Sequence, residues 1–339
     1  MRVVDGSQGE GGGQVLRTAV SLATLTGEPT RVENIRANRS NPGLRPQHQT
    51  AVRACAKICR AETDGIEVGS ETIVFEPRTR PQAGDWAFSV GTAGSVTLVL
   101  QTLIPPLLRA DAPSELTVEG GTHTLKAPTW EYFERTYLPA LERTGATLDA
   151  EIERYGFYPK GGGCIRVEIE PPAEDFVPIE LRERGELRRV EATSLLLGLP
   201  DHIATRELET FVAETGYPGI ETRTDIVDQP GTTGNVLYAE IASEALTEVF
   251  SEMGKKGRPA ETVATRLAER VRRYLQSDAP VGPHLADQLV LPISMAGGVY
   301  RTTEMTSHCR TQLELVPKFL DVDLRTTQNS DTSWLIQTR

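Results

Sequence analysis

Cysteine, lysine and long apolar runs are all scarce in this chain. The four cysteines have neither the density of a disulfide-stabilised domain nor the paired CxxC spacing of a zinc site. No stretch of about 18 apolar residues occurs, and the first residues lack the charged-then-apolar pattern of a secretory leader. We therefore expect a cytoplasmic protein in a reducing environment, without membrane contact, whose cysteines are small buried side chains.

Positive charge is also limited. Only six of the 36 basic residues are lysines, and the formal net charge is −11. Non-specific nucleic-acid binding depends on many cationic contacts to phosphates, so this balance argues against it. Residues 31–60 are the exception, because they carry seven basic side chains against one acid, a local balance of +6. A short polyanion or a strand end fits this segment, and a solvated basic helix face is the alternative.

The length of 339 residues predicts at least two domains. Two glycine triplets, at 11–13 and 161–163, lie 150 positions apart and indicate an internal repeat of a strand-helix-strand-helix-strand-strand unit. Proline-rich and acidic stretches near 171–175 and 280–283 mark boundaries. We predict a core of residues 1–180 and 277–339 with an α+β domain inserted at 181–276.

The first glycine triplet opens an apolar-periodic segment that should form a helix ending at Gly27. Backbone N–H groups at such a helix start can approach an anion closely. The neighbouring side chains of Glu10, Gln14 and Arg17 offer a carboxylate for a metal, a neutral hydrogen-bonding group and a guanidinium for phosphate. A flexible glycine-rich turn is the alternative, since such motifs often match by chance.

A polar, turn-rich stretch at 36–45 is a candidate binding loop. Pro46 suits the first position of the helix that follows, which places Gln47 and His48 in its first turn, beside the basic loop.

Strands are expected at 66–76 and 85–90, and a helix from Trp130 to Leu141. Between them, residues 91–95 again place glycines before an apolar helix. Gln101 is the one polar side chain on a face of that helix, so it caps a buried polar atom or faces a ligand.

Two later helix starts carry polar side chains. A helix kinked at Pro292 should bring His284, Asp287 and Gln288 together near its start. His308 should lie in the first turn of the last amphipathic helix, after an N-cap at Thr306 or Ser307. The positive helix end then lowers the pKa of His308 towards a neutral, nucleophilic imidazole. An exposed histidine without function is the alternative.

Together these segments resemble the RNA 3′-terminal phosphate cyclases. The resemblance covers nearly the whole chain and rests on long motifs in the same order. They read DGSQGEGGGQVLR at 5–17, RANR at 36–39, PGLRPQH at 42–48, GTAGS at 91–95, GFYPKGGG at 156–163, LADQLVLP at 285–292 and SH at 307–308.

The resemblance implies a fold and a reaction. The fold would be three βαβαββ units like the C-terminal domain of bacterial translation initiation factor three, with a smaller α+β insert. The reaction would be ATP-dependent RNA processing in three steps. A histidine attacks the ATP α-phosphorus to give covalent histidine-AMP, AMP passes to the RNA 3′-phosphate as RNA(3′)pp(5′)A, and the 2′-hydroxyl then displaces AMP to leave a 2′,3′-cyclic phosphate.

Carried over by position, the resemblance implies that His308 is the nucleophile and that Glu10 holds Mg²⁺ or Mn²⁺. ATP would contact Gln14, Arg17, Gln101, Pro128, His284, Asp287 and Gln288. The RNA 3′-phosphate end would contact Arg39, Arg45, Gln47 and His48. In the family, adenine lies between a proline and an aromatic residue, whereas His284 occupies the second position here, which puts adenine affinity in doubt.

Two other function classes stay open. One is a non-catalytic ribosome-assembly factor of the same fold, against which His308 and Glu10 argue. The other is a carbon–oxygen transferase of similar repeat architecture, such as an enolpyruvyl transferase, whose basic loops would bind a phosphorylated metabolite. The physiological RNA, the choice of metal and the oligomeric state, with a homodimer among the alternatives, also stay open.

Overall fold

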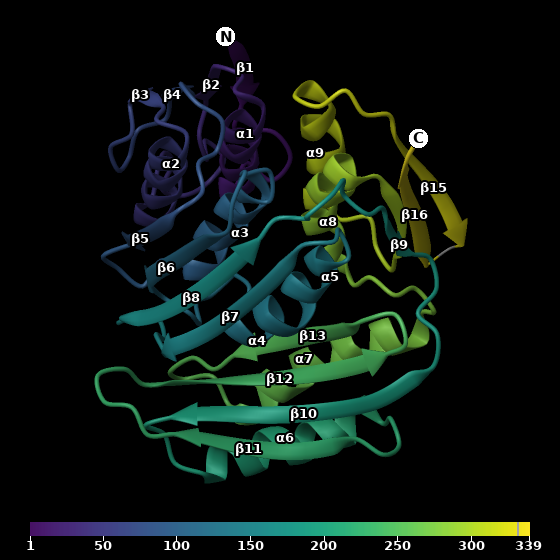
Figure 1. Cartoon of the computed structure of the whole chain (residues 1–339). Coiled ribbons are helices and arrows are strands. Elements are labelled where there is room, and N and C mark those ends of the chain that lie inside the picture. Colours follow the sequence, from purple (N-terminus) through teal and green to yellow (C-terminus); the bar gives the residue numbers. More distant parts are fainter. Residues whose placement is uncertain (331) are drawn as a thin grey trace.

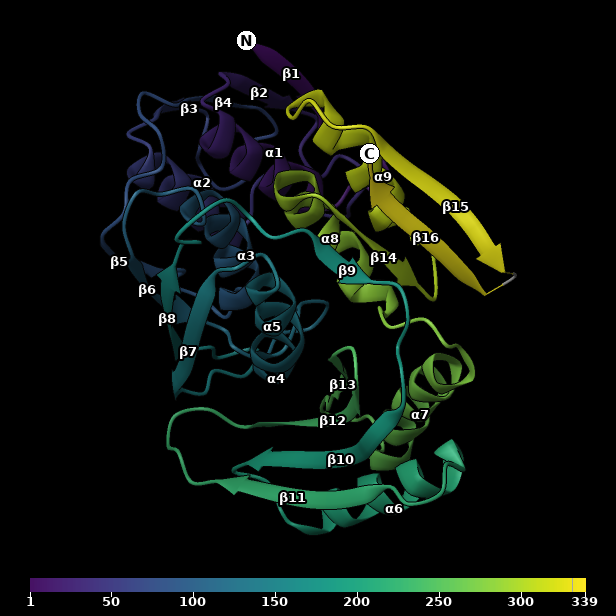
Figure 2. The same ribbon diagram turned by 45° about the vertical axis from the view of Figure 1, so that its right-hand side comes forward.

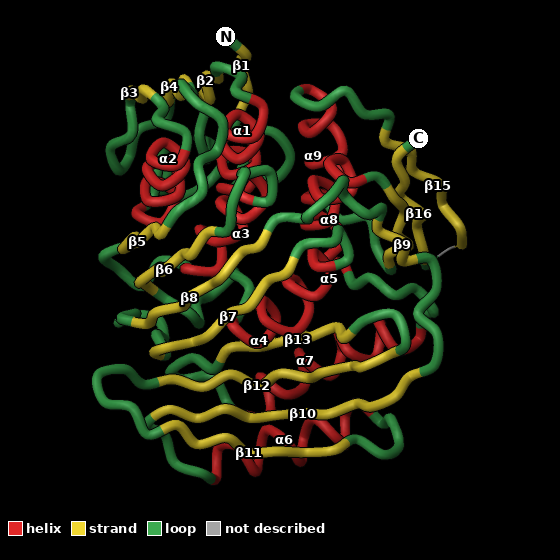
Figure 3. Tube along the Cα trace, in the orientation of Figure 1, coloured by secondary structure: helices red, strands yellow, loops and turns green. Residues whose placement is uncertain are grey.

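Four small mixed sheets form the framework of a computed structural model that describes residues 1–330 and 332–339. Helices pack against each sheet (Figures 1 and 3). One large hydrophobic core includes buried side chains from all four sheets. The α+β class expected from the sequence is therefore confirmed at this coarse level. Within the described chain, no helix is long and apolar enough to cross a membrane.

The N-terminal sheet has the order β1-β2-β4-β3, with β1 and β2 parallel and the remaining pairs antiparallel. Its segment contains β1 (Arg2–Asp5), α1 (Gly13–Thr26), β2 (Thr30–Glu33), α2 (Pro46–Ile58), β3 (Glu62–Asp64) and β4 (Ile73–Glu76). The predicted end of α1 is confirmed, because Gly27 has φ 74° and closes the helix in the left-handed conformation. Pro46 begins α2 as expected.

The second sheet repeats this order as β5-β6-β8-β7. Its segment contains β5 (Asp85–Ser89), α3 (Val96–Leu107), β6 (Ser114–Gly120), α4 (Trp130–Tyr132), the π-helical turn η1 (Phe133–Tyr137), α5 (Leu138–Glu142), β7 (Thr147–Arg154) and β8 (Gly163–Glu170).

The C-terminal sheet, read from β9, has the same order again, β9-β14-β16-β15. It combines β9 (Ile179–Leu181) with α8 (Pro283–Ala296), β14 (Gly298–Thr302), α9 (Ser307–Leu315), the short helix η2 (Val316–Lys318), β15 (Leu324–Ser330) and β16 (Ser333–Thr338). Helices α8 and α9 of this segment pack beside α1, as the views from two sides agree (Figures 1 and 2).

The fourth sheet interrupts this last segment between β9 and α8. Its order is β11-β10-β12-β13, and it has a separate hydrophobic core under α6 and α7. Its elements are β10 (Leu187–Leu197), α6 (His202–Thr215), β11 (Glu221–Val227), β12 (Gly234–Ser243), β13 (Thr247–Met253) and α7 (Ala260–Gln276). In Figure 2 the chain runs down from β9 into this sheet at the bottom of the view.

Two sequence-based element predictions are wrong in detail. The single strand expected at 66–76 is only β4, because Gly65 and Gly69 adopt φ 70° and 94° in the turn before it, and β3 precedes that turn. The single helix expected from Trp130 to Leu141 is divided by η1.

Candidate active site

The starts of α1, α8 and α9 meet at one glutamine. Gln14 on α1 donates a hydrogen bond from Nε2 to Asp287 Oδ2 on α8. Its Oε1 lies 2.6 Å from Nδ1 of His308 on α9. These partners stand 273 and 294 positions away in the chain, so the fold alone brings them together.

This arrangement determines the tautomer of His308. The Gln14 amide group directs its NH₂ to Asp287, so its oxygen faces His308 and accepts a hydrogen bond from the Nδ1–H group. A neutral imidazole with its proton on Nδ1 has a free electron pair on Nε2. We therefore assign Nε2 as the nucleophilic atom of this histidine.

Glu10 lies beside that atom. Its Oε2 is 3.3 Å from His308 Nε2 and 3.3 Å from a guanidinium nitrogen of Arg39, and its Oε1 accepts a 2.7 Å hydrogen bond from Ser307 Oγ. The hydrogen bond from Ser307 is the largest cause of a lowered pKa of Glu10. The carboxylate of Glu10 thus lies between the guanidinium of Arg39 and the nucleophilic Nε2 of the half-exposed His308.

The pKa of His308 is lowered, in the direction that the sequence predicted, but burial and nearby charges cause it and not the helix end. Burial is the largest cause, Glu10 opposes it, and the charges of Arg17 and Arg39 add to it. The helix start is formed as expected, because the Thr306 hydroxyl accepts a hydrogen bond from Cys309 N and caps α9. The imidazole is therefore held in its neutral, reactive form at neutral pH.

Asp287 and Arg17 are two partly buried charges behind this group. Burial raises the pKa of Asp287 to about 7, and Arg17 acts against that rise. Burial also lowers the pKa of Arg17 to about 10. The guanidinium of Arg17, close to Asp287, therefore offers positive charge to a phosphate bound at this site.

The glycine triplet forms a tight seat at the start of α1. A Cβ added to Gly13 would lie 2.1 Å from His48 Nε2, and one on Gly12 would lie 3.1 Å from an Arg39 nitrogen. The helix has Gly12 as N-cap and no side-chain cap within the described chain, so its first N–H groups are available. This geometry fits the anion seat expected from the sequence.

His48 faces this seat as a neutral donor. It is buried, and its Nδ1 accepts a 3.2 Å hydrogen bond from the backbone N–H of Arg45. The ring proton is therefore on Nε2, the atom that faces Gly13. Burial, aided by the charges of nearby arginines, holds the pKa of His48 well below its usual value.

The remaining candidates lie on surrounding elements. Gln47 Oε1 accepts a 2.8 Å hydrogen bond from Ser95 N at the start of α3. Gln101 Nε2 donates to Gln288 Oε1 at 2.7 Å. Pro128 O accepts from the Thr97 hydroxyl at 2.8 Å.

Three candidates are solvent-exposed, and two contributing residues were missed. Glu10 is exposed, and so are Arg45 and His284 at the starts of α2 and α8. Sequence reasoning named Ser307 only as a possible N-cap and gave it no role in the site, although it bonds Glu10. It did not single out Tyr132, whose hydroxyl donates to Gln288 Oε1 at 3.1 Å. Ser307 could have been found from its place next to His308 in the motif, whereas Tyr132 had no sequence signal.

Glu10 is the only site candidate with a carboxylate near the nucleophile. Among the described residues no group of three or more His, Cys, Asp or Glu could hold a metal by itself. Mg²⁺ is commonly held by one or two carboxylates together with substrate phosphates. One exposed carboxylate beside an anion seat fits that mode.

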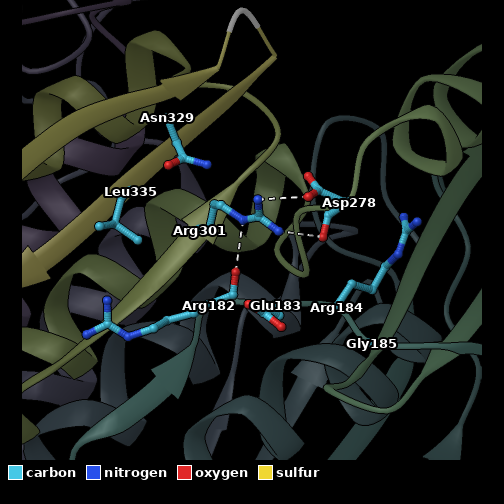
Figure 4. Close-up of a pocket in the computed structure, with 8 residues that line it drawn as sticks. All are labelled: Arg182, Glu183, Arg184, Gly185, Asp278, Arg301, Asn329 and Leu335. Carbon is cyan, nitrogen blue, oxygen red and sulfur yellow. Dashed lines mark hydrogen bonds and ion pairs between the residues drawn. The ribbon is translucent and has the colours of Figure 1, made fainter.

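A separate open cavity of about 510 Å³ lies away from these residues, where the two chain segments leading to and from the fourth sheet cross (Figure 4). Arg301 joins those segments, because it donates 2.9 Å hydrogen bonds to Arg182 O and to both Asp278 O and Oδ2. Acidic and basic side chains line it together, and none of the predicted site residues does.

Comparisons with known proteins place these residues in context. A family model described as RNA 3′-terminal phosphate cyclase matches residues 8–326. A protein of that name from Koribacter versatilis (strain Ellin345) is 47% identical over 98% of this chain and 93% of its own length. Proteins of the same name from Ectopseudomonas mendocina (strain ymp) and Ralstonia nicotianae (strain ATCC BAA-1114 / GMI1000) are 42% and 43% identical over 97% of this chain, and over 96% and 94% of their own lengths.

Proposed function

The chain belongs to the RNA 3′-terminal phosphate cyclase family and is assigned as an enzyme of that family, and from this premise we propose that it converts an RNA 3′-phosphate into a 2′,3′-cyclic phosphate at the expense of ATP. The observation that carries the proposal is the bond from His308 Nδ1 to Gln14, which leaves Nε2 free beside Glu10 and the glycine seat. A nucleophile next to an anion seat is what nucleotidyl transfer requires.

In the first proposed step, His308 Nε2 attacks the ATP α-phosphorus. The bond from that phosphorus to pyrophosphate breaks, and a phosphoramidate forms. Arg17 and the N–H groups of the glycine seat would hold the triphosphate. Arg39, which the resemblance assigns to the RNA end, contacts Glu10 and is proposed here to reach the triphosphate as well. The carboxylate of Glu10 would bind a divalent cation, which supplies charge stabilisation at the phosphates when it is bound.

In the second step, an oxygen of the RNA 3′-phosphate attacks the bound AMP and displaces His308. Arg45, Gln47 and His48 are proposed to hold the RNA end. In the third step, the 2′-hydroxyl loses its proton and attacks the activated phosphorus, so that AMP leaves and the cyclic phosphate forms. Adenylylation is needed because a phosphate monoester alone has no good leaving group.

The adenine site is proposed at the start of α8. Gln101, Gln288 and Asp287 would contact the nucleotide, with Pro128 and His284 on either side of the base. An imidazole in place of a larger aromatic ring provides less stacking area, so adenine affinity should be modest.

The domain organisation is also part of the proposal. Three sheets with the same strand order support three βαβαββ units like the C-terminal domain of translation initiation factor three. Residues 181–276 would be the inserted α+β domain, with 1–180 and 277–339 as the core.

One assay separates the proposal from its rivals. Purified protein is incubated with α-labelled ATP, a divalent cation and an RNA that ends in a 3′-phosphate. The proposal predicts labelled protein and an RNA end that becomes resistant to phosphatase. A ribosome-assembly factor or an enolpyruvyl-type transferase would give neither result, and that outcome would refute the proposal.

A further inference from the structure

A carboxyl group from the fourth sheet reaches the start of α8. Glu248 belongs to β13, and only 1% of its surface is exposed. A Cβ added to Gly282, the N-cap of α8, would lie 2.3 Å from Glu248 Oε1. The backbone N–H of Gly282 is close enough to this carboxyl group to lower its pKa, against the effect of burial. The first residue of a helix in the core is thus held by a side chain from the sheet that interrupts the core.

The position of Glu248 is fixed by the π-helical turn. The Thr136 hydroxyl of η1 donates a 3.0 Å hydrogen bond to Thr247 O and accepts a 2.9 Å hydrogen bond from Val249 N. These are the two neighbours of Glu248 in the strand. Single π-helical turns are common at functional sites because they alter the direction of nearby side chains. Here the turn binds β13 on both sides of the carboxyl group.

Helix α8 connects the Glu248 contact at its start with the candidate active site. Its first two turns contain Asp287, which orients Gln14 and through it His308, and Gln288, which bonds Gln101. The hydroxyl of Tyr132 also bonds Gln288. A shift at the start of α8 would therefore move two groups proposed to contact ATP.

Glu248 is suited to a structural role as a neutral acid. Burial raises its pKa well above the usual value, and the nearby N–H of Gly282 opposes this only in part. Its Oε2 is buried and has no hydrogen-bond partner among the described residues. Among the described residues no cation contributes to its pKa, so the uncharged form costs least. An amide of the same shape should then replace it.

We propose that Glu248 is a positioning residue through which the inserted sheet holds the start of α8 and so places Asp287 and Gln288 for ATP. This inference rests on the proposed function and assigns a role to the inserted segment. It acts on ATP binding through other groups, so Glu248 is not itself a catalytic residue.

The test compares Glu248→Leu with Glu248→Gln in full-length protein, by the steady-state rate of RNA 3′-phosphate cyclisation at varied ATP. A misplacement of about 1 Å can cost about 100-fold, so we expect Glu248→Leu to raise the KM for ATP about 10- to 100-fold with a smaller change in kcat. Glu248→Gln should stay within about twofold of the wild type, because the amide oxygen can accept a hydrogen bond from the nearby N–H of Gly282. A variant that only unfolds loses active protein and lowers kcat, with no change in KM.

Glu207→Gln is the matched control. Glu207 is another fully buried carboxyl of the fourth sheet region, but it bonds Ser194 and Asn235 within that region. It should leave the KM for ATP unchanged. If Glu248→Leu does not fold, Thr136→Val removes both bonds to β13 while keeping the side-chain shape, and it should raise the KM in the same direction.

The possible failures are distinct. A wild-type protein that takes no label refutes the proposed function. A labelled wild type with an unchanged KM in Glu248→Leu and Thr136→Val overturns the positioning role alone. An equal rise in Glu248→Gln and Glu248→Leu would also overturn it, since the neutral acid would then not be what holds α8.

Discussion

Gln14 offers the sharpest test of how His308 is activated. Gln14→Met keeps the length of the side chain and removes both hydrogen bonds, whereas Gln14→Glu keeps the length and adds a negative charge. In the protein the bond from His308 Nδ1 to Gln14 is 2.6 Å long and holds the proton away from Nε2. Both variants change the hydrogen bonding of His308 while leaving the histidine itself in place.

The expected loss of rate in Gln14→Met follows from the strength of one hydrogen bond. A neutral hydrogen bond contributes about 0.5–1.5 kcal/mol net, which corresponds to a factor of about 2 to 13 in rate. Gln14→Met should therefore slow self-adenylylation at saturating ATP by about that factor, or by more if the bond to Asp287 also orders α8. Saturating ATP keeps weaker nucleotide binding from contributing to the measured rate.

Gln14→Glu should change the pH dependence instead. The wild-type pKa of His308 is lowered, so its nucleophile is lost only as the pH falls below about 6.5, the ordinary histidine value. A carboxylate at position 14 favours the charged imidazolium and raises that pKa. The acid limb of single-turnover self-adenylylation should then move to higher pH.

The control is Gln49→Glu, which adds the same charge on α2 at a glutamine that bonds Ile66 O. The acid limb of its pH–rate profile should match that of the wild type. The tautomer argument would be refuted if Gln14→Met reacted at the wild-type rate and Gln14→Glu kept the wild-type acid limb.

Three further predictions follow from the charges of the molecule. RNA binding should depend weakly on salt, with a slope matching roughly two to four phosphate contacts at about −0.7 each, and a slope for about eight contacts would contradict an end-only site. Arg45→Ala should reduce cyclisation and spare self-adenylylation, whereas Arg39→Ala should reduce both because Arg39 contacts Glu10; the two activities are measured separately. Burial raises the pKa of Glu207 from 4.5 to about 7, so its contribution to stability is present below pH 4.5 and lost as the pH rises through about 7. Glu207→Gln should therefore remove a pH dependence of about 3 kcal/mol at most from denaturant unfolding, and an unchanged profile would contradict the raised pKa.

Local chemistry explains which elements the sequence predicts well. Helix ends at Gly27, Pro46 and Thr306 depend on backbone freedom, a fixed φ and a hydroxyl cap, and all three are found as expected. Edge strands such as β11 and β15 lack a buried alternating face, so their sequence carries no strand period. These two strands form because each pairs with a neighbouring strand of its sheet. The π-helical turn η1 lies within a regular apolar pattern and is equally invisible to periodicity.

The candidate site likewise has features that the sequence predicts and features that depend on the fold. The motifs identify Gln14, Asp287 and His308 one by one, because glycine seats and helix starts are local features. The hydrogen bonds that join them link residues more than 270 positions apart, and only the packing of α1, α8 and α9 creates them. For the same reason the contact of Glu248 with Gly282 could not be predicted, since it depends on how the fourth sheet lies against the core.

The most direct test of the account is to locate the covalent AMP. Wild-type protein incubated with α-labelled ATP should carry label that is acid-labile and stable in mild alkali, as a phosphoramidate is. His308→Asn should carry none, while it still cyclises some pre-made RNA(3′)pp(5′)A, because that last step needs only the 2′-hydroxyl and a positioned leaving group. Label that persists in His308→Asn, or that resists acid, would contradict the assignment of His308 as the nucleophile.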